Sequence, residues 1–203
     1  MKFTPEGKAV YNYSELLETA QKIALEEIQY ELFYQAAESI DVNYYFDPKI
    51  ELLNKKGFRN INFYRFVIEE EFIKIDFTFE YPINQNTLHT FQKFATDSNH
   101  YIPISLKNRI KSNTLIIEVF SNQSNYENNL RNIEVQYASD IKDTDLKEYI
   151  PQLKKLFENY YDFTVSRLYQ KILKYLEDST NYTKTLSCIK SYKFYFNGQL
   201  YEE

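Results

Sequence analysis

The sequence predicts an α+β fold, in which two long helices pack with a mainly antiparallel sheet. Helices are expected at about residues 14–39 and 146–177, because both stretches carry apolar residues at helical spacing and no glycine. A sheet is expected because apolar and polar residues alternate between residues 61 and 81, and because extended stretches recur between 114 and 138. The 203 residues are expected to form one domain, residues 1–203.

The first long helix is expected to begin at Ser14 as its N-cap, with Glu15 and Glu18 in its first turn. Its main apolar stripe contains six residues: Leu16, Leu17, Ala20, Ile23, Ala24 and Ile28. Phe33 lies off this stripe, so apolar side chains occur on more than one side of the helix. Such a helix either passes through a core or touches a second protein, and the core is the favoured interpretation.

A shorter helix is predicted after a brief extended stretch at residues 42–46. Asp47 is a good N-cap, and Pro48 suits the first helical position. Gly57 can adopt the left-handed conformation that often ends a helix.

The following strands, residues 60–68 and 73–81, are expected to pair as an antiparallel hairpin. Residues 69–71 would lie near its turn, and Pro82 would end its second strand. The other expected elements are a helix at 86–94, a loop at 96–103, strands at 114–121 and 130–138, a polar loop at 122–129 and an acidic turn at 140–145.

The second long helix is expected to hold Pro151 in its first turn. Phe163 and Tyr169 fall outside its broad apolar side. Near the end of the chain, Asn197-Gly198 stands between aromatic or apolar residues and predicts a two-residue type I′ turn, with both residues at positive φ. Residues 186–203 are therefore expected to form a C-terminal hairpin that protrudes from the domain.

Few side chains in the chain suit metal or cofactor chemistry. The three glycines are isolated, which excludes the glycine-rich loops that bind phosphates. His89, His100 and Cys188 are too few for a structural zinc site, so neither a metal nor a cofactor is predicted. Each histidine could act as a general base, but no nucleophile motif accompanies it and a structural role is favoured. Cys188 is expected to be a buried, unreactive thiol in a strand or loop.

Asp76 and Glu80 form the most suggestive pair of carboxylates, on one face of a predicted strand beside Lys74. Some nucleases place carboxylates and a lysine on adjacent strands around a metal ion. The spacing here departs from the usual Glu-x-Lys step, and alternating charges are typical of a solvated sheet face. No catalytic residue is therefore assigned, and a metal-dependent hydrolase or nuclease is retained as the third hypothesis.

The composition favours binding over catalysis, since 20 Tyr and 16 Phe residues provide much contact surface. An AT-rich genome would produce a similar excess of aromatic residues. A net charge of −5 argues against nucleic acid as the partner. Residues 1–7 lack an apolar leader, and the chain lacks an uncharged apolar run of the ~20 residues that a membrane span needs. A cytoplasmic protein without a membrane partner is expected.

The leading hypothesis is a non-catalytic protein-interaction or assembly subunit, for example a structural component of a phage or virus particle. Its aromatic surface would bind another copy, giving a homo-oligomer, or a different protein. The alternative is a small acidic immunity, antitoxin or inhibitor protein that covers an enzyme. Phe33, Phe163 and Tyr169 are the candidate contact residues, because each lies off the main apolar side of its helix.

Overall fold

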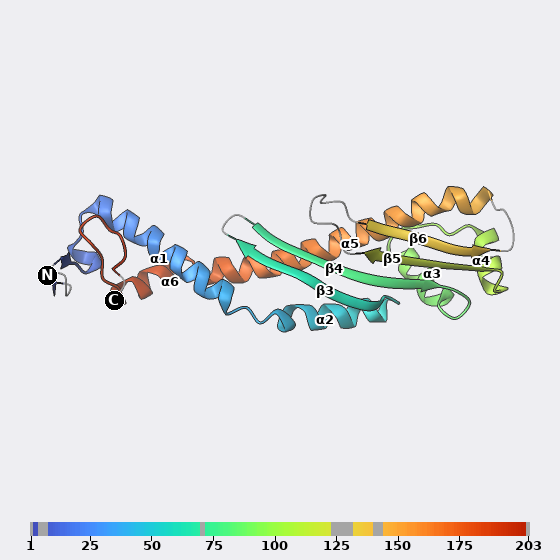
Figure 1. Ribbon diagram of the computed structural model, residues 1–203, viewed down its shortest axis with the longest axis horizontal. Coiled ribbons are helices and arrows are strands. Elements are labelled where there is room, and N and C mark those ends of the chain that lie inside the picture. Colours follow the sequence, from blue (N-terminus) through green and yellow to red (C-terminus); the bar gives the residue numbers. More distant parts are fainter. Residues whose placement is uncertain (1, 4–7, 70–71, 123–131, 140–143, 202–203) are drawn as a thin grey trace. The chain divides into compact units, whose positions relative to one another are not determined.

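The computed structural model describes residues 2–3, 8–69, 72–122, 132–139 and 144–201. The chain forms two compact units. Unit 1 combines Met1–Asp41 with Lys171–Glu203, and unit 2 is Val42–Gln170. The α+β prediction is confirmed by the helices and the four-stranded antiparallel sheet (Figure 1). The expectation of a single domain stays a prediction.

Each unit has its own set of secondary-structure elements. The described elements of unit 1 are β1 (Lys2–Phe3), β2 (Ala9–Val10), the 3-10 helix η1 (Tyr13–Glu15), α1 (Glu18–Glu38), α6 (Tyr182–Cys188) and the 3-10 helix η2 (Ile189–Ser191). The described elements of unit 2 are α2 (Val42–Lys55), β3 (Arg59–Glu69), β4 (Phe72–Ile83), α3 (Leu88–Asp97), α4 (Ile104–Lys111), β5 (Leu115–Asn122), β6 (Asn132–Ser139) and most of α5 (Thr144–Ser179). The boundary between the units falls inside α5.

The sheet of unit 2 has the strand order β3-β4-β5-β6, and all three pairings are antiparallel. In Figure 1 its strands lie side by side while α5 crosses behind them. The β3–β4 hairpin was predicted, but Glu70 and Glu71 at its expected turn lie outside the described residues. The expected polar loop, from residue 123 onward, and residues 140–143 of the acidic turn also lie outside them.

Two irregularities in β3 change which of its side chains face the core. The register with β4 shifts between Arg59 and Asn62, where Asn60 has a φ of 49°, and again between Phe63 and Arg65. Because a bulge adds one residue to one strand, it reverses the alternation beyond it. The simple alternation expected from the sequence was wrong here, since Phe66 pairs with Ile75 and so shares the face of Phe63.

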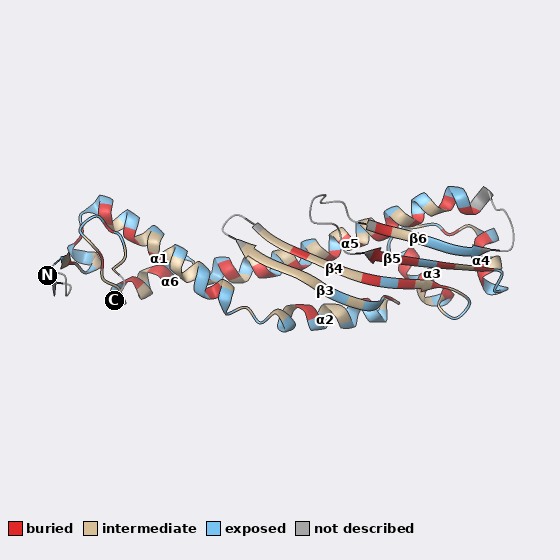
Figure 2. Cartoon of the chain, viewed as in Figure 1, coloured by how far each residue is buried: buried red, intermediate tan, exposed pale blue. Residues whose placement is uncertain are grey.

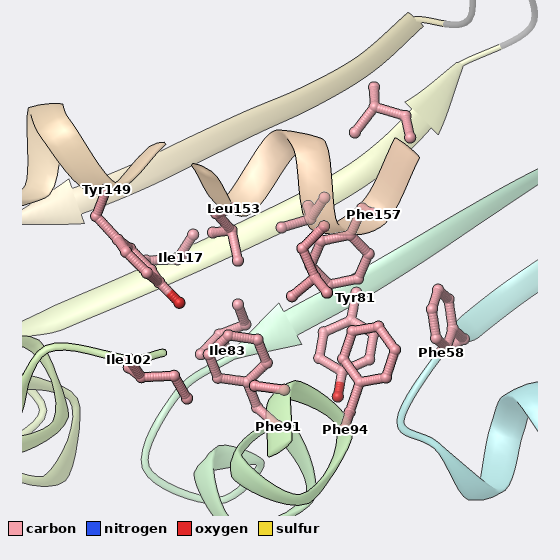
Figure 3. Packing of buried hydrophobic residues seen from close by; sticks show 14 of the residues in the cluster. Phe58, Tyr81, Ile83, Phe91, Phe94, Ile102, Ile117, Tyr149, Leu153 and Phe157 are labelled. Carbon is pink, nitrogen blue, oxygen red and sulfur yellow. The ribbon is translucent and has the colours of Figure 1, made fainter. Parts of the chain in front are cut away.

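The core of unit 2 lies between one face of the sheet and the four helices α2 to α5. Phe157 of α5 meets four other rings in its centre, those of Phe58, Phe79, Tyr81 and Phe94, with ring centres 5.0 to 5.9 Å away; Figure 3 labels all of these except Phe79. The buried strand residues of this core face are Phe77, Phe79, Tyr81 and Ile83 in β4, Leu115, Ile117 and Val119 in β5, and Ile133 in β6. Such a large set of buried rings and branched side chains fixes the helices on this face.

The opposite face, here called the outer sheet face, carries the alternate residues of the same strands. Figure 2 shows buried segments alternating with less buried ones along β4. The members of this face that are used below are Thr78, Glu80 and Pro82 in β4, Glu118 and Phe120 in β5, and Glu134 and Gln136 in β6, all exposed or half-buried.

The start of α2 differs from the sequence expectation. The helix begins at Val42, so Asp47 is not its N-cap and Pro48 lies inside it. Phe46 explains the difference, because its ring stacks on Phe63 at 4.3 Å and is buried. This packing outweighs the hydrogen bond that a proline cannot donate inside a helix. The helix end was predicted correctly, since Gly57 has a φ of 98° just beyond Lys55.

Both long helices were predicted, but their first turns differ from expectation. α1 begins at Glu18, and Ser14 belongs to the separate helix η1, where Glu15 accepts hydrogen bonds from the backbone and side chain of Asn12. α5 begins at Thr144, so Pro151 lies in its interior. In α1 the buried residues are Ala20, Ala24, Ile28 and Ala36, whereas Leu17 and Ile23 of the expected stripe are exposed.

Unit 1 is held by a smaller core that joins distant parts of the chain. Leu16, Ala20, Ala24, Ile28, Ile189 and Phe194 form its buried cluster. Tyr11 and Phe194 exchange two backbone hydrogen bonds, of 2.8 and 3.0 Å. These contacts bind the segment after η2 to the segment before α1.

The C-terminal turn forms at the predicted place but with different geometry. Gly198 N–H donates to the Tyr195 carbonyl at 2.9 Å, and only Gly198 of the Asn197-Gly198 pair has a positive φ, of 92°. Tyr195 N–H donates to the Gln199 carbonyl, so the loop contains three residues and is not the two-residue type I′ turn. The expected hairpin over residues 186–203 is also shorter, because α6 and η2 occupy residues 182–191.

Gly198 has a second constraint, from which the first prediction follows. A Cβ added to this residue would lie 2.2 Å from the carbonyl oxygen of Ala20 in α1, at a φ that side chains disfavour. We expect Gly198→Ala to lower the free energy of unfolding by about 2 kcal/mol or more. Urea unfolding followed by circular dichroism measures this loss. Asn197→Ala is the control and should cost much less, so equal losses would contradict the prediction.

Candidate interaction surface

Phe163 is the candidate contact residue with the most exposed side chain. Its side chain is 50% exposed on α5. The Nζ atom of Lys49 lies 5.8 Å from the ring centre, and the guanidinium carbon of Arg167 lies 5.2 Å from it. Leu52 of α2, on the same two helices, is also exposed. We name Lys49, Leu52, Phe163 and Arg167 the cation–aromatic surface.

The packing of α5 explains why these groups point outward. Phe157, Tyr161 and Leu168 are buried and face the core. Phe163 and Arg167 are four residues apart, so they lie one above the other on another side of the helix. Cations near a ring face are attracted by its quadrupole, by about 0.5–1 kcal/mol at an exposed site.

A second ring–cation contact joins Tyr160 of α5 to Lys56, which directly follows α2. Tyr160 stacks on Phe58, with 5.3 Å between ring centres, and the Nζ atom of Lys56 lies 5.6 Å from the Tyr160 ring. Lys56 also pairs with Asp97 at 3.7 Å. Burial, with a further effect of the Asp97 charge, raises the pKa of Tyr160 to about 12. This ring is therefore neutral at physiological pH and mostly serves the core.

The three candidate contact residues are divided between the two units. Phe33 lies on α1 in unit 1, half-buried, with its ring centre 5.9 Å from that of Tyr34. Phe163 and Tyr169 both lie on α5 in unit 2, but six residues apart, so they point to different sides of the helix. Tyr169 is half-buried. Phe163 is the most exposed of the three, and the role of each stays a prediction.

The outer sheet face contains an acidic region that the sequence analysis did not identify. Phe120 of β5 pairs with Glu80 of β4 on one side and with Glu134 of β6 on the other. Glu118 lies two residues away on the same strand and therefore on the same face. Phe120 is thus bordered by three carboxylates. The alternation of Glu118 and Phe120 was visible in the sequence, but the neighbours from β4 and β6 required the register.

A groove of about 520 Å³ lies on this region of the outer sheet face. Its lining includes Arg59, Glu80, Pro82, Glu118 and Phe120. Arg59 is the register partner of Glu80, so one cation lies at the edge of the acidic region. The groove is open and mostly polar, and Phe120 is the aromatic residue of its lining that belongs to the outer sheet face.

Asp76 and Glu80 lie on the same strand but have different partners. Asp76 accepts a hydrogen bond from the Tyr161 hydroxyl at 3.2 Å and lies 3.9 Å from Arg65. Glu80 accepts one from the side chain of Asn60 at 2.6 Å. Within the described residues, no three His, Cys, Asp or Glu side chains are grouped so that they could hold a metal ion. The hydrolase hypothesis stays untested.

The Tyr161 hydroxyl has a structural function where β5 stops pairing with β4. It accepts a hydrogen bond from Phe77 N–H at 3.2 Å while its ring stacks on the Phe77 ring at 4.4 Å. Ser121 completes the arrangement by accepting from Phe79 N–H and donating to the Phe77 carbonyl. Burial raises the pKa of Tyr161, so the hydroxyl stays protonated. Within the described residues, these two hydroxyls therefore bond to backbone groups of β4 at the end of its pairing with β5.

The two histidines have different environments. His89 is exposed. His100 is half-buried, and its Nε2 atom lies 3.1 Å from the buried Tyr149 hydroxyl. Burial lowers the pKa of His100, which favours the neutral imidazole. A structural role for His100 is therefore consistent with its contacts.

Cys188 ends α6 and is half-buried, so its predicted place in a strand or loop was wrong. The cap of α6 explains the helix, because Asn181 accepts a hydrogen bond from Lys184 N–H at 3.0 Å.

Two further findings concern membrane spans and similarity to known proteins. Among the described residues, no helix is both long enough and apolar enough to cross a membrane. No protein family, curated protein or solved structure was found to match this chain. The chain's own residues therefore carry the functional argument.

Removing the Tyr161 hydroxyl provides a test of its structural function. Tyr161→Phe keeps the stacked ring but leaves the buried Phe77 N–H without its partner. We expect the free energy of unfolding to fall by about 1–3 kcal/mol, measured by urea denaturation. Tyr101→Phe removes an exposed hydroxyl and should change stability by less than about 0.5 kcal/mol. A loss confined to Tyr101→Phe would contradict this assignment.

The His100 environment predicts a specific pH dependence. Because the pKa of His100 is lowered in the folded state, the unfolded state binds the proton more tightly. The stability that is present above the unfolded pKa of about 6.5 is therefore lost as pH falls through the folded pKa. His100→Gln should flatten the decline in thermal midpoint just below pH 6.5. His89→Gln is the matched control and should leave the slope unchanged; a parallel decline in wild type and His100→Gln would exclude His100 as its cause.

Proposed function

We propose that the protein is a non-catalytic assembly subunit that self-associates through its cation–aromatic surface. The observation that carries this proposal is the half-exposed Phe163 ring with two cations within 6 Å of its centre. The exposed Leu52 lies three residues after Lys49 and so on the same side of α2. Aromatic residues and arginine are enriched among the residues that dominate binding energy. A phage or virus particle is one setting in which such a subunit would act.

The expected contribution of this surface to the free energy of association is moderate. Covering the exposed part of one ring and of a leucine contributes about 1–3 kcal/mol. The stems of Lys49 and Arg167 add apolar contact around the ring, since both side chains can pack along it while their charges reach outward. Such a contact suits a concentration-dependent assembly in which several weak contacts act together.

A second candidate function is supported by the outer sheet face. Its carboxylates at Glu80, Glu118 and Glu134 would suit the covering of a basic enzyme, as an acidic immunity or inhibitor protein does. This function predicts a stable monomer or dimer with a concentrated acidic face, and not an assembly that grows with concentration. The two functions are therefore separated by one solution measurement.

Phe163→Ala should weaken self-association. We expect wild type to increase in mean mass across a hundredfold concentration range in light scattering, and Phe163→Ala to raise the dissociation constant about tenfold. Tyr101→Ala is the matched control, because Tyr101 is a 68% exposed ring of unit 2 with the Nζ atom of Lys107 at 6.0 Å. A wild-type chain that stays monomeric throughout, or equal losses in both variants, would overturn the proposal.

A further inference from the structure

We propose that the cation–aromatic surface of one chain binds the acidic region of the outer sheet face of a second copy. The association is then head-to-tail. This inference rests on the proposed self-association and names the surface that binds the cation–aromatic surface.

The two surfaces are complementary in charge, and each contains one aromatic ring near charged side chains. The first presents one half-exposed ring, Phe163, with the cations of Lys49 and Arg167 within 6 Å of its centre. The second presents one half-buried ring, Phe120, bordered by the carboxylates of Glu80 and Glu134 along its row. Opposite charges at the rim of a contact fix its orientation and speed association.

The groove beside Phe120 can receive a ring. Its volume of about 520 Å³ is large enough for an aromatic ring together with the apolar stems of the flanking cations. Glu80 and Glu118 line this groove, so a cation carried in beside the ring meets a carboxylate there. The open shape of the groove allows entry from the solvent.

The positions of the two surfaces in unit 2 decide the type of assembly. The cation–aromatic surface is built by α2 and α5, which pack on the core face of the sheet. The acidic region lies on the opposite face, so both surfaces of one chain can be occupied at once. A contact between two different patches generates rings or open filaments instead of a closed two-fold dimer.

The pairing is tested with two charge-reversed chains. One carries Lys49→Glu and Arg167→Glu, and the other carries Glu118→Lys and Glu134→Lys. Each alone should associate about a hundredfold more weakly than wild type, because like charges then meet at the contact. Each chain keeps one intact surface. Circular dichroism verifies that both are folded.

Mixing the two reversed chains gives the decisive measurement. The intact outer sheet face of the first chain binds the intact cation–aromatic surface of the second, and the two reversed surfaces, now acidic and basic, again carry opposite charges. Light scattering should therefore show that the mixture recovers the association that each reversed chain has lost on its own. The wild-type contact should also weaken as salt is raised.

The control reverses two cations of α4 with Lys107→Glu and Lys111→Glu, and it should associate like wild type. If wild type forms oligomers but the Glu118→Lys, Glu134→Lys chain associates equally well, the outer sheet face is not the partner surface, although self-association through Phe163 can still stand. If the mixture contains only monomers while wild type forms oligomers, the head-to-tail pairing is overturned. A monomeric wild type overturns the proposed function itself.

Discussion

The packing of α5 against the core face of the sheet determines what the rest of unit 2 can present. Phe157 lies among Phe58, Tyr81 and Phe94, and Tyr161 stacks on Phe77. Each buried ring contributes about 1.5–3 kcal/mol, so turning α5 about its axis would expose several at once. The helix therefore has one rotation, and that rotation directs Phe163 and Arg167 outward.

The same packing also provides a hydrogen-bond partner for a buried backbone N–H. β4 is longer than its pairing with β5, and a buried N–H at Phe77 would lack a partner if only aliphatic side chains faced it. A tyrosine in the helix supplies both a ring for the core and a hydroxyl for the backbone. Some of the chain's many tyrosines thus act inside the protein, and their number alone is a poor measure of its binding surface.

The fold could be predicted from the sequence where local signals agreed with the packing. Alternation predicted β4 and β5, and Gly57 correctly ended α2, because both signals act over a few residues. Asp47 and Pro48 predicted the wrong start of α2, because burial of Phe46 outweighed their capping signal. The acidic region around Phe120 was missed because its carboxylates come from three strands and meet only through the register. The place of Phe163 off the apolar side of α5 needed only the helical period, and its role as a contact residue stays a prediction.

The backbone contact between Tyr11 and Phe194 has a consequence for how the chain folds during synthesis. Unit 2 is one continuous segment, Val42–Gln170, so all of its partners have been made once that segment leaves the ribosome. The early part of unit 1 must wait until residues after Lys171 follow. Since domains generally fold as their sequence emerges, the aromatic core should form first, leaving Ala20 and Ile28 exposed as a nascent hydrophobic segment suited to chaperone binding.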